Sequence, residues 1–341
     1  MGSTRWDDEH YASRASLRAA TGEPTFAHDA SVAKAVWSAL AAGDYEAADA
    51  AKKAHKTLDP FGVKLRESRD SDVHPTARAI ATLLDVTGSM LEIPKIEQKT
   101  LPKLMGLLTG KGYLEHPAIL TGAIGDATCD RVPLQMGQFE SGIEIENDLT
   151  NLYLEAGGGG QNTESYELAL YFMARHTVTD CWEKRQEKGY IFITGDERPY
   201  SAVSAAQVKK VIGDNLQGDI SIEEIVSELK ERWHIFYIMP KMTNHFGDEN
   251  ILRPWRKLLG QNVILLEDPN GVSQCIATQI GVCEGKIDGD DAVEDMIAAG
   301  TDKMVAKAVG RALVPAGSGG RAKGTDIAVP DSGGGSGIAT L

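Results

Sequence analysis

The sequence lacks the features that define several large protein classes. Its four cysteines (Cys129, Cys181, Cys275 and Cys283) are scattered and form no CxxC pair, so neither a disulfide framework nor a zinc site of clustered cysteines is expected. No apolar run approaches the roughly 20 residues that span a bilayer, and the charged N-terminus contains no signal-peptide core. These absences predict a cytoplasmic protein that does not enter a membrane.

Positive charge is also scarce. The 341 residues include 35 Lys and Arg against 49 Asp and Glu, which gives a net charge of −14 at pH 7. Such an acidic chain is poorly matched to the phosphate-neutralising surface that nucleic-acid binding needs. Hydrophobic residues make up 42% and charged residues 25% of the chain, which is an ordinary globular balance. We therefore expect a folded protein with no nucleic-acid partner.

Composition divides the chain into four regions. Residues 1–76 are rich in alanine and helix formers, which predicts an N-terminal helical extension that contains a short helical hairpin. Residues 77–285 alternate short β runs with helical periods and predict the main domain. A C-terminal helical segment is expected over 286–311, and a Gly/Ser-rich flexible tail over 312–341. Trp6, Tyr11 and Trp37 are expected to anchor the extension on the main domain.

The main domain is predicted to be a doubly wound α/β fold with a mostly parallel sheet. Its β runs are continuously apolar, as expected of strands buried on both faces. A further strand within Arg131–Phe139 is expected at the sheet edge, since Pro133 would not fit a central strand. A capping box at Ser221–Glu224 begins one helix, and another is expected to open near Thr163. The other expected strands are Ala79–Val86, Ala118–Gly125, Tyr190–Thr194, His234–Met239 and Val263–Glu267.

One short motif carries most of the chemical information. Asp85-Val-Thr87-Gly-Ser89 directly follows the apolar run 79–84 of an expected buried strand, and ligands of open α/β sheets bind at the carboxyl ends of strands. A carboxylate and two hydroxyls at alternate positions are hard oxygen ligands that suit Mg²⁺, with Mn²⁺ or Ca²⁺ as other candidates. Asp, Thr, Gly and Ser are also common turn residues, so this motif alone would not establish a metal site.

Two later segments offer further oxygen ligands. A run of four glycines at 157–160 leads into an expected helix and brings hydroxyls at Thr163 and Ser165. The expected strand Tyr190–Thr194 is followed by Gly195 and Asp196. Because the carboxyl ends of parallel strands lie at one edge of a sheet, these groups are expected to meet the first motif there.

This order of motifs resembles the von Willebrand factor A (vWA) domain, in a form similar to its bacterial, intracellular branch. The resemblance covers roughly residues 77–270 and implies a metal-ion-dependent adhesion site. It further implies that two hydroxyls ligate the metal directly, that the first carboxylate acts mainly through a coordinated water, and that the second is direct or water-bridged. The implied ligands in this sequence are Asp85, Thr87, Ser89, Thr163 and Asp196.

The sequence departs from the vWA pattern at two places. The family usually has Asp-Gly after the later strand, whereas here the order is Gly195-Asp196, which moves the carboxylate by one residue. In the glycine loop, another alignment puts Gln161 in the position of Thr163, and Ser165 is a further candidate. Thr163 is the simplest assignment of the third-loop ligand.

The resemblance implies a binding function rather than catalysis. Three or four protein oxygens and one or two waters would leave one position on Mg²⁺ for an Asp or Glu of a partner protein. The two site carboxylates and Mg²⁺ are together near neutral, so the metal could attract an acidic group even on an acidic protein. Intracellular vWA proteins often serve AAA-type ATPases or multi-protein assemblies, which is the setting that the resemblance implies.

Two other functions are weighed against this one. A metal-dependent phosphohydrolase of the haloacid dehalogenase type would also use Asp85, with Asp196 as a distal magnesium ligand. Such enzymes carry a second Asp as acid/base where this chain has Thr87, and a threonine cannot transfer protons at neutral pH. A structural subunit of a larger particle would instead use the helical extension and the tail and would need no metal.

Overall fold

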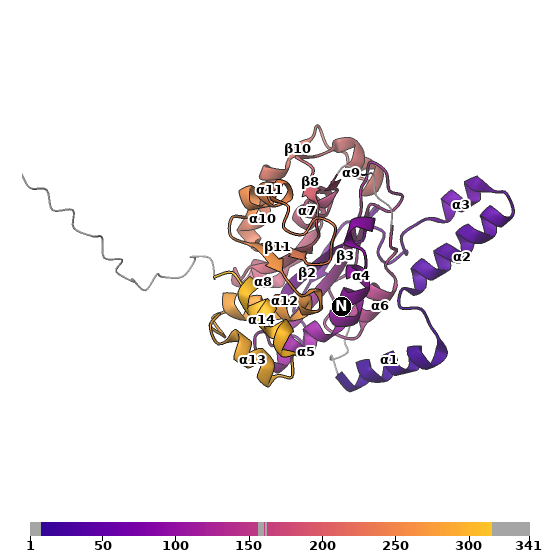
Figure 1. Ribbon diagram of the computed structural model, residues 1–341. Coiled ribbons are helices and arrows are strands. Elements are labelled where there is room, and N and C mark those ends of the chain that lie inside the picture. The colour runs from indigo at the N-terminus through magenta and orange to yellow at the C-terminus, as the bar shows by residue number, and fades with distance from the viewer. Residues whose placement is uncertain (1–7, 156–159, 161, 316–341) are drawn as a thin grey trace, which may run out of the picture.

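The computed structural model describes residues 8–155, 160 and 162–315, and its centre is a six-stranded sheet with the strand order β12-β11-β7-β2-β3-β4 (Figure 1). Five strands run parallel and β4 lies antiparallel at the edge, so the predicted doubly wound, mostly parallel sheet is confirmed. The strands are β2 (Arg78–Asp85), β3 (Pro117–Ile124), β4 (Leu134–Met136), β7 (Gly189–Thr194), β11 (Trp233–Pro240) and β12 (Val263–Leu266).

Two hydrophobic cores lie on the two faces of this sheet. In β2, Ala79, Ala81 and Leu83 belong to one core, whereas Ile80 and Leu84 belong to the other. This alternation follows from the period of two along a strand. All of these side chains are buried, as expected for a parallel sheet that helices cover on both faces.

The covering helices divide between the two faces (Figure 1). The first core includes side chains from α7 (Tyr166–Arg175), α8 (Asp180–Arg185), α9 (Ala205–Val211), α10 (Ile222–Arg232) and α11 (Glu249–Leu259). The second face is covered by α4 (Ile93–Thr100), α5 (Pro102–Gly110), α6 (Glu144–Thr150), α12 (Val272–Cys283), α13 (Ala292–Ala298) and α14 (Lys303–Ala312). Two short 3₁₀ helices, η1 (Gly88–Met90) and η2 (Pro269–Gly271), follow β2 and β12.

The two helix predictions are also confirmed in their local detail. The Ser221 side chain accepts a hydrogen bond from the Glu224 backbone N–H at 3.2 Å and caps α10, as its capping box predicts. The helix expected near Thr163 begins at Tyr166, and its apolar residues are buried against the sheet. The extra edge strand also forms, as the short β4.

Small strand pairs at the periphery were not expected from the sequence. Strand β1 (Arg66–Ser68) pairs in parallel with β6 (Thr177–Thr179), β5 (Thr163–Glu164) with β8 (Arg198–Pro199), and β9 (Ala202–Val203) with β10 (Ile220–Ser221) in antiparallel fashion. Segments of two or three residues are too short to show a period of two, so only the tertiary structure reveals them.

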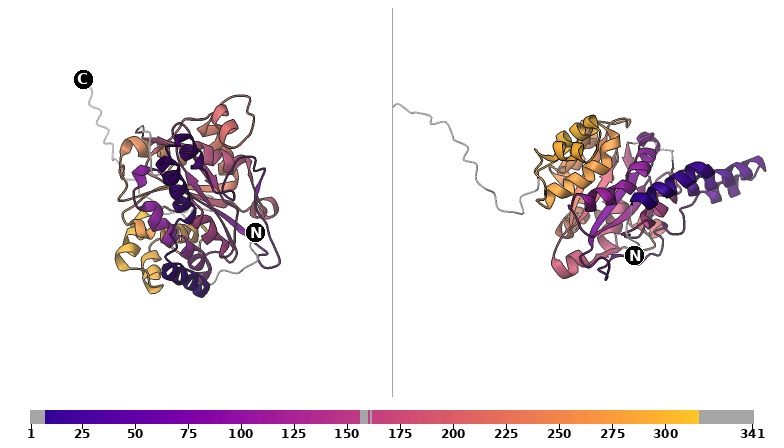
Figure 2. Two further views of the ribbon diagram at one scale, coloured as in Figure 1. Left: turned by 90° about the vertical axis from the view of Figure 1, so that its right-hand side faces the viewer. Right: turned by 90° about the horizontal axis from the view of Figure 1, so that it is seen from below.

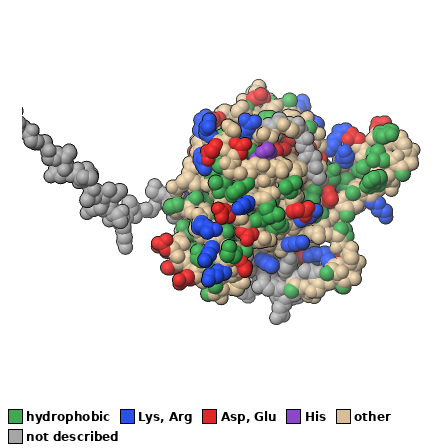
Figure 3. Space-filling model, in the orientation of Figure 1, with side chains coloured by type: hydrophobic (Ala, Val, Ile, Leu, Met, Phe, Trp, Pro, Cys, Tyr) green, Lys and Arg blue, Asp and Glu red, His purple; other side chains and the backbone are tan. Residues whose placement is uncertain are grey.

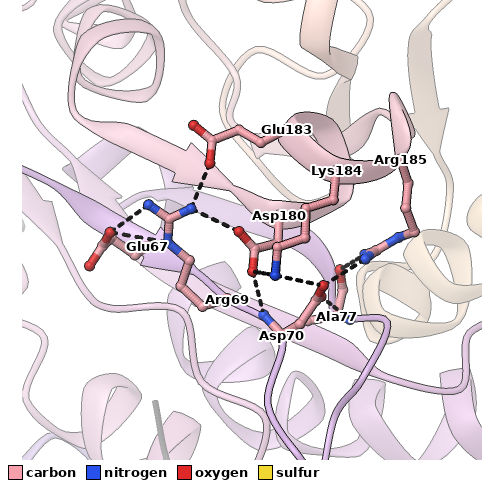
Figure 4. Close-up of polar contacts among 8 residues, drawn as sticks. All are labelled: Glu67, Arg69, Asp70, Ala77, Asp180, Glu183, Lys184 and Arg185. Carbon is pink, nitrogen blue, oxygen red and sulfur yellow. Dashed lines mark hydrogen bonds and ion pairs between the residues drawn. The ribbon is translucent and has the colours of Figure 1, made fainter.

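An ion-pair network joins the chain after β1 to α8 (Figure 4). The Asp180 carboxylate accepts hydrogen bonds from the Arg69 guanidinium at 2.8 Å and from the Asp70 backbone N–H at 2.9 Å. Lys184 lies 2.7 Å from the same carboxylate, and Arg185 binds Asp70 at 2.8 Å. The network therefore connects the N-terminal region to the first face of the main domain.

The N-terminal helices form the expected hairpin, α2 (Ala27–Ala41) and α3 (Tyr45–Ala51), preceded by α1 (Asp8–Thr21). Figure 2 shows the hairpin extending away from the sheet and its helices. Of the three expected anchors, Trp6 and the side chain of Tyr11 lie outside the part of the chain that the structure describes. The expectation for Trp37 is wrong, because 73% of that side chain is exposed. Figure 3 shows hydrophobic side chains on the visible surface of the hairpin. Val32 makes the contact instead, packing with Val132 and Tyr153.

The remaining findings concern the cysteines, the membrane-spanning potential of the helices and the C-terminal tail. All four cysteines are free. None of the helices in the described part of the chain has the combination of length and apolar character that crossing a bilayer would need. Residues 316–341 of the expected tail lie outside the described residues.

Candidate functional site

The strand order changes direction between β2 and β7, and the carboxyl ends of these two strands lie side by side. From β2 the chain moves to β3 and β4 on one side, and it later returns to β7 on the other side of β2. Connections that leave in opposite directions open a crevice between the two strands, which is where open α/β sheets bind ligands. Asp85 is the last residue of β2, and Asp196 follows Thr194, the last residue of β7, by two positions. Both predicted carboxylates therefore lie at this switch point.

A chain of hydrogen bonds connects four residues at the carboxyl ends of β2 and β7, which we call the rim: Asp85, Thr87, Ser89 and Asp196. The Thr87 hydroxyl donates to Asp85 Oδ1 at 2.6 Å and lies 3.2 Å from the Ser89 hydroxyl oxygen. Ser89 in turn donates to Asp196 Oδ1 at 2.7 Å. The structure thus brings together oxygens from two strand ends, as the sequence predicts. The Gly195-Asp196 order moves the carboxylate by one residue relative to the vWA pattern, but Asp196 still hydrogen-bonds to Ser89 in this group.

Burial makes this cluster electrostatically unfavourable when it is ionised. Asp85 and Asp196 are both fully inaccessible to solvent. Desolvation raises the pKa of Asp85, and the negative charge of Asp196 raises it further against the hydrogen bonds from Thr87 and Tyr166. Burial also raises the pKa of Asp196, although Ser89 and His245 oppose this. A bound cation would offset both penalties because it favours the charged form of each carboxyl group.

Tyr166 explains why a glycine precedes Asp196. Its hydroxyl donates to Asp85 Oδ2 and accepts from the Glu197 backbone N–H at 3.4 Å, so it lies across the two strand ends. A Cβ atom at Gly195 would overlap the Tyr166 hydroxyl and ring. The glycine is therefore needed for a close approach between the strand end and α7.

The third-loop candidates lie in different surroundings. Thr163 is in β5, where it pairs with Arg198 and lines a surface groove. The Ser165 hydroxyl accepts a hydrogen bond from the Ala127 backbone N–H at 2.9 Å and holds the loop after β3. Gln161 lies outside the described residues. The assignment of Thr163 as a ligand stays a prediction, and Ser165 has a clear structural role.

Glu164 is the site residue that sequence reasoning missed. It is 2% exposed, and its Oε2 has no hydrogen-bond partner among the described residues. Burial raises its pKa strongly, and the charges of Asp85 and Glu197 add to this effect. Its carboxyl group is therefore close enough to those of Asp85 and Glu197 for their charges to act on it. Its position next to Thr163 in the sequence was the available signal, because adjacent strand residues face opposite sides.

The loop after β11 completes the rim. The His245 backbone N–H donates to Asp196 Oδ2 at 3.2 Å, and the Asn244 backbone N–H donates to the Ser89 carbonyl at 3.1 Å. The His245 imidazole lies 3.9 Å from the Glu197 carboxylate. No pattern in the sequence indicated these contacts, since they depend on how a loop folds back over the sheet edge.

The donor set fits a hard divalent cation. The rim offers two hydroxyls and two buried carboxylates, and Glu164 adds an unpartnered buried oxygen. Within the described residues, no group of three or more Asp, Glu, His or Cys side chains is arranged to hold a metal by itself. Hydroxyl oxygens would therefore have to complete the ligand set, which agrees with Mg²⁺ chemistry rather than with a zinc site.

Comparisons by sequence find no relatives for this chain. No protein-family model matches it, and no curated protein matches it. Family membership is therefore not established by sequence.

Several solved structures match parts of this chain at low similarity. Proximal thread matrix protein 1 from the mussel byssus matches 64% of this chain and 48% of that chain, with 9% identity and a TM-score of 0.40. The open form of the pilus adhesin SpaC from Lactobacillus rhamnosus GG matches 63% and 31%, with 9% identity and a TM-score of 0.42.

A von Willebrand factor type A protein from Catenulispora acidiphila also matches, over 61% of this chain and 42% of that chain, with 11% identity and a TM-score of 0.37. The chain thus spans between about a third and a half of the length of these structures. At such identities and TM-scores, the likenesses carry no argument about function.

Proposed function

We propose that this chain is a Mg²⁺-dependent protein-interaction module of the vWA type that binds an acidic residue of a partner protein in the cytoplasm. The observation that carries the proposal is the connected set of oxygens from Asp85, Thr87, Ser89 and Asp196 at the switch point of the sheet. Two hydroxyls and two carboxylates at one rim are a suitable cradle for a hard cation.

In this proposal each rim residue has a defined task. Thr87 and Ser89 would offer their hydroxyl oxygens to the metal, Asp196 would bind it directly or through water, and Asp85 would act mainly through water. Mg²⁺, when bound, supplies a positive charge and an exchangeable position for an Asp or Glu of the partner. Tyr166 and the Thr87 backbone N–H hold the Asp85 carboxylate in place.

A binding role is favoured over catalysis for a chemical reason. A phosphohydrolase of the haloacid dehalogenase type needs a second carboxyl group two residues after the first, and Thr87 occupies that position. Its hydroxyl donates to Asp85 and cannot transfer protons at neutral pH. An AAA-type ATPase or another multi-protein assembly is the proposed setting for the partner.

The test combines metal binding with partner capture. Wild type, Ser89→Ala and Asp85→Asn are compared in Mg²⁺ and in EDTA, by titration calorimetry for the metal and by affinity capture from native lysate. We expect wild type to bind Mg²⁺ and to retain a partner in Mg²⁺ only, and both variants to lose metal and partner. The exposed Asp290, in an acidic turn, supplies the control Asp290→Asn, which should behave as wild type.

Two results would contradict the proposal. The first is a folded wild-type protein that binds no Mg²⁺. The second is a partner that is retained in EDTA and by the Ser89→Ala variant, which would mean that the partner binds elsewhere on the chain.

A further inference from the structure

A basic groove lies beside the metal rim and has no part in the proposed metal site. It has a volume of about 530 Å³ and is formed by β8, the start of α10 and one side of α11. The residues that define the basic groove are Arg198, Pro199, Ile222, Arg253, Pro254 and Lys257. Its other lining residues include Thr163, Tyr200 and one acidic residue, Glu223.

The groove combines an apolar floor with cationic edges. Ile222 is 3% exposed and lies at the base, and two prolines add apolar surface. Arg253 is exposed and makes no hydrogen bond or ion pair with any other described side chain. Lys257 pairs with Glu223 at 2.9 Å, but both side chains are more than half exposed, so water screens that pair. The net charge along the groove is positive on a chain whose overall charge is −14.

The basic groove lies next to the metal rim, on the other side of the β5–β8 pair. Thr163 lines the groove, and the adjacent Glu164 is buried at the rim. Tyr200, another lining residue, contacts the Asp126 carboxylate at 3.2 Å on the loop after β3. The Trp255 indole in α11 donates to the Glu197 carbonyl at 2.9 Å and fixes the groove wall against the rim. A ligand held at the rim would therefore extend naturally into the groove.

We propose that the basic groove binds the peptide segment next to the metal-binding acidic residue, and that it selects an apolar side chain flanked by further acidic residues. This inference rests on the proposed function for the position of the first acidic residue. The apolar floor removes one side chain from water, and the cationic edges attract acidic neighbours and raise the association rate. The partner chemistry is thus an acidic peptide with an embedded apolar residue.

A larger hollow of about 910 Å³ between α1 and α6 does not compete with this assignment. Its lining mixes Arg14, Arg18 and Arg66 with Glu144 and Asp148, so its charge favours no class of ligand.

Three peptide libraries test the selectivity. All are fluorescein-labelled decapeptides with random small polar ends. The first has the core Glu-Leu-Asp-Leu-Glu, the second replaces both Leu by Ser, and the third replaces both Glu by Lys. Fluorescence anisotropy measures their affinity for the full chain and for Arg253→Glu, in Mg²⁺ and in EDTA. Arg256→Glu is the control, because Arg256 lies on the same helix, is also exposed and does not line the groove.

We expect the first library to bind wild type in Mg²⁺ at least about fivefold more tightly than the other two. Arg253→Glu should weaken that binding about five- to tenfold, because it removes an attraction and adds a repulsion, whereas Arg256→Glu should change it less than about twofold. Arg253→Ala, a milder change, should weaken it about two- to threefold. Thermal unfolding confirms that each variant is folded.

The outcomes separate the groove from the metal. If no library binds, if all three bind equally, or if Arg253→Glu behaves as Arg256→Glu does, the groove proposal is overturned, even where binding still needs Mg²⁺ and Ser89. If the preference for the first library and the effect of Arg253→Glu persist in EDTA, the groove proposal stands and the metal dependence of the proposed function fails.

Discussion

At the scale of the residue, Glu97 is a buried glutamate close to Asp85. Glu97, in α4, is 1% exposed, and its Oε1 has no hydrogen-bond partner among the described residues. Burial raises its pKa to about 8, and the charge of Asp85 adds to this effect while a hydrogen bond from Thr194 opposes it. At neutral pH this side chain is therefore protonated in the folded protein and ionised in the unfolded chain.

The pH dependence of stability follows from that difference. Between pH 4.5 and about 8 the folded state binds a proton at Glu97 that the unfolded state has lost. The contribution of Glu97 to the free energy of unfolding is therefore fully present below pH 4.5, and it is lost as the pH rises through 8. We predict that Glu97→Gln flattens the decline in the free energy of unfolding between pH 5 and 9, by on the order of 2–4 kcal/mol. Urea unfolding at several pH values measures this.

The control for Glu97 is an exposed glutamate. Glu249 is 63% exposed and pairs with Arg256, so Glu249→Gln should leave the slope against pH unchanged. An equally steep decline in wild type and in Glu97→Gln would show that Glu97 titrates normally.

At the scale of elements, the network around α8 determines how the N-terminal region is attached (Figure 4). Burial alone would raise the pKa of Asp180, but hydrogen bonds from Lys184, Arg69 and the Asp70 backbone lower it to about 2. The stabilisation from this carboxylate is therefore present above pH 3.8, its value in the unfolded chain, and is lost as pH falls towards 2.

We predict that Asp180→Asn lowers the free energy of unfolding at pH 7 by about 1–3 kcal/mol, because the buried side chain loses its negative charge and one of its two acceptor oxygens. Glu183 binds the same Arg69 guanidinium but is 52% exposed. Glu183→Gln should therefore change the free energy of unfolding by less than about 0.5 kcal/mol. Chemical denaturation compares the two, and equal effects would mean that burial of the network contributes nothing.

At the scale of the whole molecule, the cation would act as a link between the strands. Asp85 ends β2 and Asp196 follows β7, so one ion bound by both would join the two central strands at their carboxyl ends. A ligand that binds only the folded state stabilises it by mass action.

We predict that Mg²⁺ at ten times its dissociation constant stabilises wild type by about 1.4 kcal/mol, which corresponds to a rise in Tm of roughly 3–5 °C for a domain of this size. Ser89→Ala should show no such rise, while the distant Asp290→Asn should match wild type. Differential scanning calorimetry in Mg²⁺ and in EDTA makes the comparison, and an identical rise in Ser89→Ala would place the ion elsewhere.

Much of the architecture followed from local pattern. The parallel strands were predicted within one residue at every end, because continuous apolar runs bounded by turn residues have few other solutions in a chain with helical periods between them. The capping box at Ser221 located α10 for the same local reason. Trp37 was misplaced, because a large apolar side chain does not by itself indicate burial.

The candidate site divides in a similar way. The sequence alone determined that Asp85, Thr87, Ser89 and Asp196 lie at or just after strand ends, and topology then made their meeting a consequence of parallel strands. Only the tertiary structure decided that Glu164 rather than Thr163 is buried at the rim and that Tyr166 reaches Asp85. Which side of a two-residue strand faces the rim, and which loop folds over it, depend on packing between segments distant in the chain, and no local pattern encodes such contacts.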